Sequence, residues 1–192
     1  MKSKMIIFLG AMGLMLGLVG APASWANSLT FQGVTFNLTE VDSNTLQLNI
    51  LNAESTTNPN WADAEFLKNI GLKDIGTVGG ATLTGFSVTS LELNANGCGG
   101  GDSGGFCFTS NLANGVAVTD NMTFTIDFAT GALNLDAPHL KVRFLDATGT
   151  KEGSLLSQTI PPGTSVPEPA SLMLLGAGLA GLGIWRRKVS KG

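Results

Sequence analysis

Alternation of apolar and polar side chains constrains the fold of this chain more than any other feature of its sequence. In residues 121–128 apolar side chains occupy every second position, and polar side chains lie between them. Residues 45–51 and 139–145 repeat this pattern. Successive side chains of a strand point to opposite faces, so each segment has one apolar face that must be buried against a second layer. We therefore expect an all-β fold, an antiparallel two-sheet β-sandwich.

Turn residues separate these segments at intervals of roughly ten residues, as in antiparallel sandwiches, and on this basis we expect about eight strands. Between residues 29 and 38 the alternation changes phase at Gln32-Gly33, which predicts a β-bulge. The predicted turns are Asp42-Ser43-Asn44, Asp120-Asn121, Thr130-Gly131 and Thr148-Gly149.

Residues 58–71 fit either of two local structures. One is a short helix, capped by Asn60, that places Phe66 and Ile70 on one face. The other is a strand over residues 66–72. A parallel α/β fold is disfavoured for the chain as a whole, because no helical patterns of about 10–15 residues separate the strands.

The first 26 residues are typical of a cleavable secretory signal peptide. Two lysines precede an apolar core at residues 5–19, and small residues follow it. We expect cleavage between Ala26 and Asn27, with a cut after Ala23 as the alternative. An uncleaved anchor helix is disfavoured because the apolar core is short.

A second apolar segment lies near the other end of the chain. Residues 170–185 carry no charge and would span about 24 Å as a helix, somewhat less than a hydrocarbon core of about 30 Å. The basic residues Arg186, Arg187 and Lys188 follow at once and resist translocation. We therefore expect a single C-terminal transmembrane helix over residues 170–185. The alternative is a helix buried in the core of the domain.

The stretch before this segment reads Val166-Pro167-Glu168-Pro169. Motif, apolar helix and basic end together resemble the PEP-CTERM sorting signal of bacterial surface proteins. The resemblance implies that an exosortase, a membrane cysteine transpeptidase, recognises the motif and processes the protein, so that the helix holds the chain in the inner membrane only before processing. It also implies a Gram-negative bacterium that makes exopolysaccharide.

These features divide the chain into four parts. We expect a signal peptide over residues 1–26, an exported β-sandwich over 27–157, a Pro/Gly/Ser linker over 158–166 and the sorting signal over 167–192. The expected route runs from an inner-membrane intermediate to the cell surface or extracellular matrix of a Gram-negative bacterium.

The exported part is acidic. Between residues 27 and 165 there are five basic and thirteen acidic side chains, which give a net charge of −8 with histidine neutral. Such a chain lacks the positive surface that phosphate backbones require, so nucleic-acid binding is excluded.

Cys98 and Cys107 are the two cysteines of the chain. In an exported protein a close pair predicts a disulfide, whereas a redox pair would have a different spacing and a metal site would need further ligands. The glycine-rich stretch between them is expected to be an exposed, flexible loop. A calcium site that uses Asp102 is the weaker alternative. We expect no metal and no cofactor.

Two single residues bear on function. His139 is the one histidine of the chain, and since no G-x-S-x-G motif accompanies it, we interpret it as a turn residue rather than a catalytic base. Trp61 is the one tryptophan between the terminal segments, and it either stacks on a ligand sugar or packs in the core; we favour the core.

The expected function is therefore that of a non-enzymatic exported surface or matrix protein. The alternatives are a carbohydrate-binding module for exopolysaccharide and a secreted hydrolase with an unrecognised acidic site.

Overall fold

The computed structural model describes residues 26–163, except for the side chains of residues 102–103 and 153–156. The predicted signal peptide up to residue 25, the transmembrane helix and the sorting motif therefore lie outside the described residues. Within the described part, no helix is long and apolar enough to cross a membrane.

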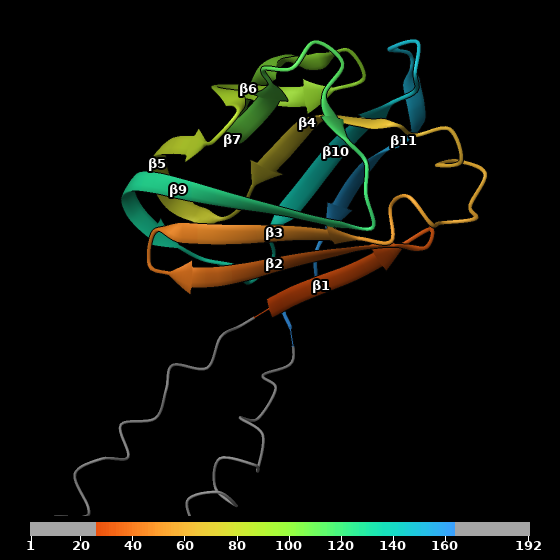
Figure 1. The fold of residues 1–192 in the computed structure, drawn as a ribbon. Helices are drawn as coiled ribbons and strands as arrows, with labels where there is room; N and C mark the ends of the chain where they lie inside the picture. The colour runs from red at the N-terminus through yellow and green to blue at the C-terminus, as the bar shows by residue number, and fades with distance from the viewer. Residues whose placement is uncertain (1–25, 164–192) are drawn as a thin grey trace, which may run out of the picture. The chain divides into compact units, whose positions relative to one another are not determined.

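The described chain forms two antiparallel sheets that pack as two layers, with their strands at an angle to each other (Figure 1). The first sheet has the order β1 (Ala26–Phe31), β2 (Val34–Asp42), β3 (Thr45–Leu51), β9 (Asn121–Leu133) and β5 (Gly76–Leu83). The second has the order β11 (Lys151–Thr159), β10 (His139–Leu145), β4 (Phe66–Lys73), β7 (Gly97–Ser110) and β6 (Phe86–Asn94), and the short β8 (Val116–Ala117) pairs with β4. The predicted two-sheet architecture is confirmed, with more strands than expected.

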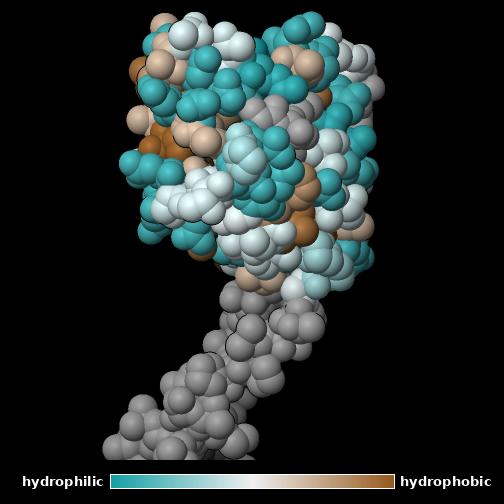
Figure 2. Space-filling model, turned by 90° about the vertical axis from the view of Figure 1, so that its right-hand side faces the viewer, coloured by the Kyte–Doolittle hydropathy of each residue, from teal (hydrophilic) through white to brown (hydrophobic). Residues whose placement is uncertain are grey.

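The hydrophobic core lies between the two sheets, as the alternation of apolar and polar side chains predicts. All three apolar side chains of β3 that face inward are fully buried, and β9 and β10 bury their apolar faces in the same way. The threonines of β9 between these positions are exposed. The face shown in Figure 2 is mostly hydrophilic, and its hydrophobic areas are small and separate.

Three local predictions are wrong. Gln32-Gly33 forms the turn of the β1–β2 hairpin rather than a bulge; both residues have positive φ, 53° and 89°, as a type I′ turn requires. Thr130-Gly131 lies inside β9, because β5 pairs along this part of the strand. The helical alternative for residues 58–71 fails because β4 pairs with β10 over residues 66–73.

The folded body also extends beyond the predicted boundary at residue 157. β11 continues to Thr159, and Ile160 is fully buried. Asn27, which is 2% exposed, donates a hydrogen bond from Nδ2 to the Leu135 carbonyl and accepts one at Oδ1 from Gly163 N at 3.0 Å. The two ends of the described chain therefore lie side by side, and β1 already includes both residues of the predicted cleavage position.

Replacing Asn27 tests how strongly it holds the two ends together. We expect Asn27→Ala to lower the free energy of unfolding by about 2–3 kcal/mol, because it leaves the carbonyl of the buried Leu135 and the amide of the half-buried Gly163 without these partners. Chemical denaturation measures this change. Asn37→Ala is the matched control; Asn37 is half-buried on β2, and its loss should cost below about 0.5 kcal/mol. Equal costs for the two variants would contradict the assigned role of Asn27.

Candidate functional site

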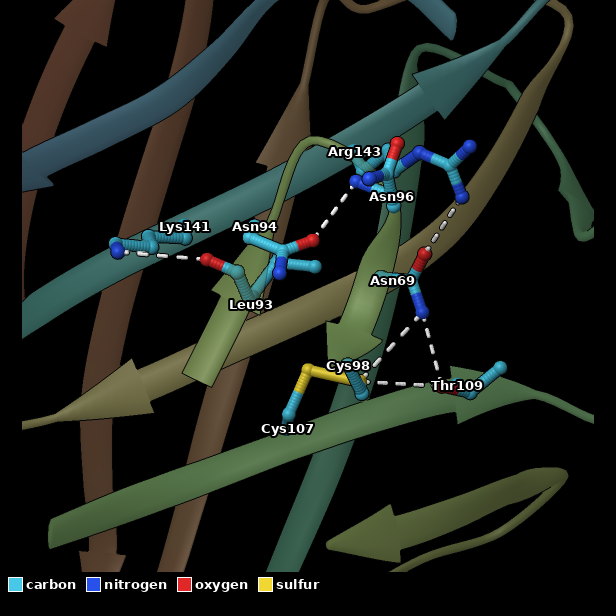
Figure 3. Close-up of a disulfide and its surroundings, with 9 residues drawn as sticks. All are labelled: Asn69, Leu93, Asn94, Asn96, Cys98, Cys107, Thr109, Lys141 and Arg143. Carbon is cyan, nitrogen blue, oxygen red and sulfur yellow. Dashed lines mark hydrogen bonds between the residues drawn. A yellow bond between two sulfur atoms is a disulfide. The ribbon is translucent and has the colours of Figure 1, made fainter. Parts of the chain in front are cut away.

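The end of the β6–β7 hairpin folds over the outer face of the second sheet (Figure 3). The pairing register between β6 and β7 becomes irregular after Thr89, and this irregularity lets the two strands leave the plane of the sheet. Leu93 is 2% exposed and packs on β4 at Gly71, where a Cβ atom would lie only 2.9 Å from the Cβ of Leu93. A glycine at residue 71 is therefore what allows the hairpin to come this close.

The predicted disulfide between Cys98 and Cys107 is confirmed. It joins the two ends of β7, with Cys98 opposite Leu93 of β6 and Cys107 opposite Gly71 of β4. The predicted flexible loop is wrong, because residues 97–110 form β7. Two of the glycines there allow close packing: a Cβ would lie 2.2 Å from the Leu72 carbonyl oxygen at Gly105, and 2.8 Å from Glu92 at Gly100.

A buried polar network lies beneath the stapled hairpin. The buried Asn69 donates from Nδ2 to Thr109 Oγ1 at 2.9 Å, and its Oδ1 accepts from the Arg143 guanidinium at 3.2 Å. Thr109 in turn contacts the Cys98 sulfur at 3.1 Å. Burial lowers the pKa of Arg143 from its ordinary value. This network fixes the hairpin on the sheet and gives Asn69 and Arg143 a structural role that the sequence did not reveal.

An ion-pair cluster holds the outer side of the hairpin. Lys141 bonds to the carboxylate of Glu92, and Lys73 lies 3.9 Å from the same carboxylate. The hydrogen bond from Lys141 is the main cause that lowers the pKa of Glu92. The carboxylate of Glu92 is therefore paired, and the three side chains together keep a net positive charge.

His139 is the first residue of β10 rather than a turn residue. Its Nε2 lies 3.1 Å from Ser157 Oγ and its Nδ1 lies 3.3 Å from Thr159 Oγ1, both on β11. The sequence analysis missed Ser157 because only the strand register brings it next to the imidazole. A catalytic Ser-His pair normally has a carboxylate on Nδ1 to orient the imidazole, whereas here a threonine hydroxyl occupies that place.

The pKa of His139 is lowered, mainly by burial and then by the positive charges of Lys73 and Lys141. We expect an NMR titration of this histidine to give a midpoint below its ordinary value of 6.5. Since the unfolded chain then takes up the proton first, the contribution of His139 to stability falls as the pH drops below about 6.5. Lys141→Met should raise the midpoint and the more distant Lys151→Met should not; a wild-type midpoint at or above 6.5 would contradict this assignment.

Trp61 is buried, so the alternative in which it contacts a ligand is wrong. Its ring is 2% exposed and packs edge to face on Phe144, with 5.0 Å between the ring centroids. Its Nε1 donates to Gln32 Oε1 at 2.7 Å. A ring in this position stabilises the core and cannot stack on a sugar in this structure.

No group of three or more His, Cys, Asp or Glu residues that could hold a metal ion occurs among the described side chains. The side chain of Asp102 is not among them. The calcium alternative therefore stays a prediction.

Comparison with protein-family models identifies the segment that follows the folded body. The model of the PEP-CTERM protein-sorting motif matches residues 165–188. The chain carries a PEP-CTERM protein-sorting motif. The match includes the proposed motif Val166-Pro167-Glu168-Pro169 and the basic residues Arg186, Arg187 and Lys188. This PEP-CTERM protein is accordingly an exported protein that passes through a membrane-anchored intermediate and is processed by an exosortase.

Comparisons with curated proteins and with solved structures show no family for the folded body. The chain matches no curated protein. Among solved structures, it is similar to an uncharacterized protein from Nocardia farcinica with an immunoglobulin-like fold, at 11% identity and a TM-score of 0.35. The match covers 76% of this chain and 90% of that one.

Proposed function

We propose that the PEP-CTERM protein is a non-enzymatic component of the cell surface or extracellular matrix of a Gram-negative bacterium. In this proposal the β-sandwich is the exported body and the exosortase removes the C-terminal segment. Exopolysaccharide is the proposed surrounding of the processed protein. The observation that carries the proposal is the match of the sorting motif to residues 165–188, which follow the described residues 26–163 closely in the sequence.

The geometry of the ionisable groups supports a non-enzymatic role. The carboxylate of Glu92 is neutralised by Lys141, and the imidazole of His139 is held by two hydroxyl groups. General acid–base chemistry needs a titratable group whose proton is available to a substrate. On the outer face of the second sheet, the side chains of Glu92 and His139 are instead bonded to neighbouring protein side chains.

A hydrolysis screen tests this role. The processed protein, purified from its host, is assayed on neutral and acidic polysaccharides and on chromogenic esters, beside the double variant Ser157→Ala/His139→Ala. We expect the two proteins to be equally inactive on every substrate. Turnover by the wild type that the double variant loses would contradict the proposal and would identify the Ser157–His139 pair as a catalytic site.

Contact with exopolysaccharide would run through hydroxyl and amide side chains, since Trp61 is buried. We expect the processed protein to remain with polysaccharide isolated from its own host in a sedimentation assay, and Trp61→Phe to be retained equally well. Complete absence of the wild type from the pellet would remove exopolysaccharide from the proposal and leave the sorting route unaffected.

A further inference from the structure

Strand β9 has a neighbour on both sides over only part of its length. β3 pairs along one side over residues 121–127. On the other side, β5 pairs with residues 126–133 of β9. After its last paired residue, Leu83, the chain turns at Thr84-Gly85 and enters the second sheet as β6. Within the described structure, residues 121–125 therefore have no strand beside them on that side.

Two backbone hydrogen bonds show which groups of β9 face the open side. Phe128 N donates to Asn44 O at 2.9 Å, and Asn52 N donates to Asp120 O at 3.0 Å. Because hydrogen-bonded and non-hydrogen-bonded pairs alternate along antiparallel strands, the even-numbered residues of β9 bond to β3. The N–H and C=O groups of the odd-numbered residues, with Thr123 at the centre, point to the open side.

These groups border a groove of about 620 Å³ between the two sheets, within the size range of ligand sites. Phe86 and Phe124 form its apolar floor, edge to face with 5.8 Å between their ring centroids. Leu112, which is 59% exposed, stands at its rim. The other lining residues are Leu83, Thr84, Gly85, Ser110, Asn111, Val116, Thr123 and Thr125. All of the lining side chains are uncharged.

The wall opposite β9 is held in place by Lys68. Its ammonium group donates to the carbonyl oxygens of Ser110, Leu112 and Ala113 at 2.9, 2.7 and 3.2 Å. Three hydrogen bonds to the end of β7 and to the loop that follows it keep this segment at the edge of the groove. The groove is therefore formed before anything binds in it.

We propose that an extended, uncharged polypeptide segment of a partner protein binds this groove by adding a strand to the open edge of β9. The incoming backbone pairs with the N–H and C=O groups at Thr123, as in other cases of β-strand addition. Its alternate side chains point inward onto Phe86 and Phe124, and those between them face solvent beside Thr123 and Thr125.

Charge selects the composition of this segment. An acidic peptide is repelled by an exported domain with a net charge of −8. A basic peptide is attracted by this overall charge but finds no carboxylate among the lining side chains to pair with in the groove. A neutral segment that alternates apolar and hydroxyl-bearing residues matches both the floor and the rim of the groove.

A peptide-binding measurement on the processed protein tests the proposal. The probe is a fluorescent acetyl-Thr-Val-Thr-Val-Thr-Val-Thr-amide peptide, and its control carries N-methyl groups on the two inner threonines. We expect the control to bind at least about tenfold more weakly, because N-methylation removes backbone donors that pair with β9. Thr123→Pro should weaken binding by a similar factor, whereas Thr123→Val keeps the N–H group and should bind within about twofold of the wild type.

Proline at the open edge uses no N–H that β3 needs, so the variant should fold. If the Thr123→Pro variant does not fold, hydrogen exchange of the wild-type amides tests the proposal instead. The amide of Thr123 should exchange at least about tenfold more slowly with the peptide than without it, whereas the amide of Met122, which already bonds to β3, should change little.

Four results would overturn the proposal. They are an absence of peptide binding, equal binding of the N-methylated control, protection of Thr123 by cellohexaose rather than by the peptide, and protection of Thr123 by self-association at high protein concentration. The last two would assign the groove to a neutral glycan or to a second copy of this chain.

Discussion

The double variant Glu168→Ala/Pro169→Ala, expressed in the native host, is expected to stay in the membrane as unprocessed protein. Pro167 and Pro169 lack amide hydrogens and disfavour helix, and on this basis we expect the stretch before the apolar segment to be recognised by an enzyme. Glu168 adds one negative charge at this position. Removing the charge and one proline should abolish recognition by the exosortase and leave the anchor attached.

Membrane fractionation and mass spectrometry measure this outcome, since retained protein still contains Trp185 and the basic residues after it. The matched control is Glu54→Ala/Pro59→Ala, which changes the same residue types in an exposed loop of the folded body. The control should be processed and released like the wild type. Normal surface release of the Glu168/Pro169 variant would contradict the role of the motif.

The sequence predicted the parts of the fold that depend on side-chain alternation. Apolar residues at every second position identified β3, β9 and β10 and their buried faces, because a strand has only two faces and one must leave water. It predicted turns less well, since Thr130-Gly131 has turn-forming residues but lies where β5 pairs with β9. Local preference gave way there to the hydrogen bonds of the sheet.

Contacts between distant residues could not be predicted in this way. Gly105 lies in the stretch that was expected to be a loop, and Gly71 lies in the alternative strand over residues 66–72; each allows a close approach of another segment that is known only from the fold. The same holds for the Ser157–His139 contact and for the open edge of β9, which depend on strand register. The sorting motif, in contrast, was predictable because it is a local pattern in the sequence.

Removal of the disulfide is expected to destabilise the folded body about as strongly as Asn27→Ala, and by a different mechanism. The variant Cys98→Ala/Cys107→Ala should lower the free energy of unfolding by about 2–3 kcal/mol in the loop-entropy model, because the unfolded chain regains the freedom of a short, glycine-rich loop. Alanine avoids placing an unpaired hydroxyl at residue 107, which is fully buried. Denaturant unfolding measures the change.

The loss should be concentrated at the end of the hairpin. Cys98 is opposite Leu93, so without the disulfide this end is held against β4 and β10 by the packing of Leu93, the Glu92 ion pairs and the hydrogen bond from Lys141 to the Leu93 carbonyl. We expect amides near residues 93–98 to exchange faster in the variant, and those in the centre of β9 to change only with global stability. Reduction of the wild type should reproduce the effect, and alkylation without reductant should leave both cysteines unlabelled. Rapid labelling of unreduced exported protein would show that the cysteines are not paired, and the hairpin would then be held on the sheet by its packing and hydrogen bonds.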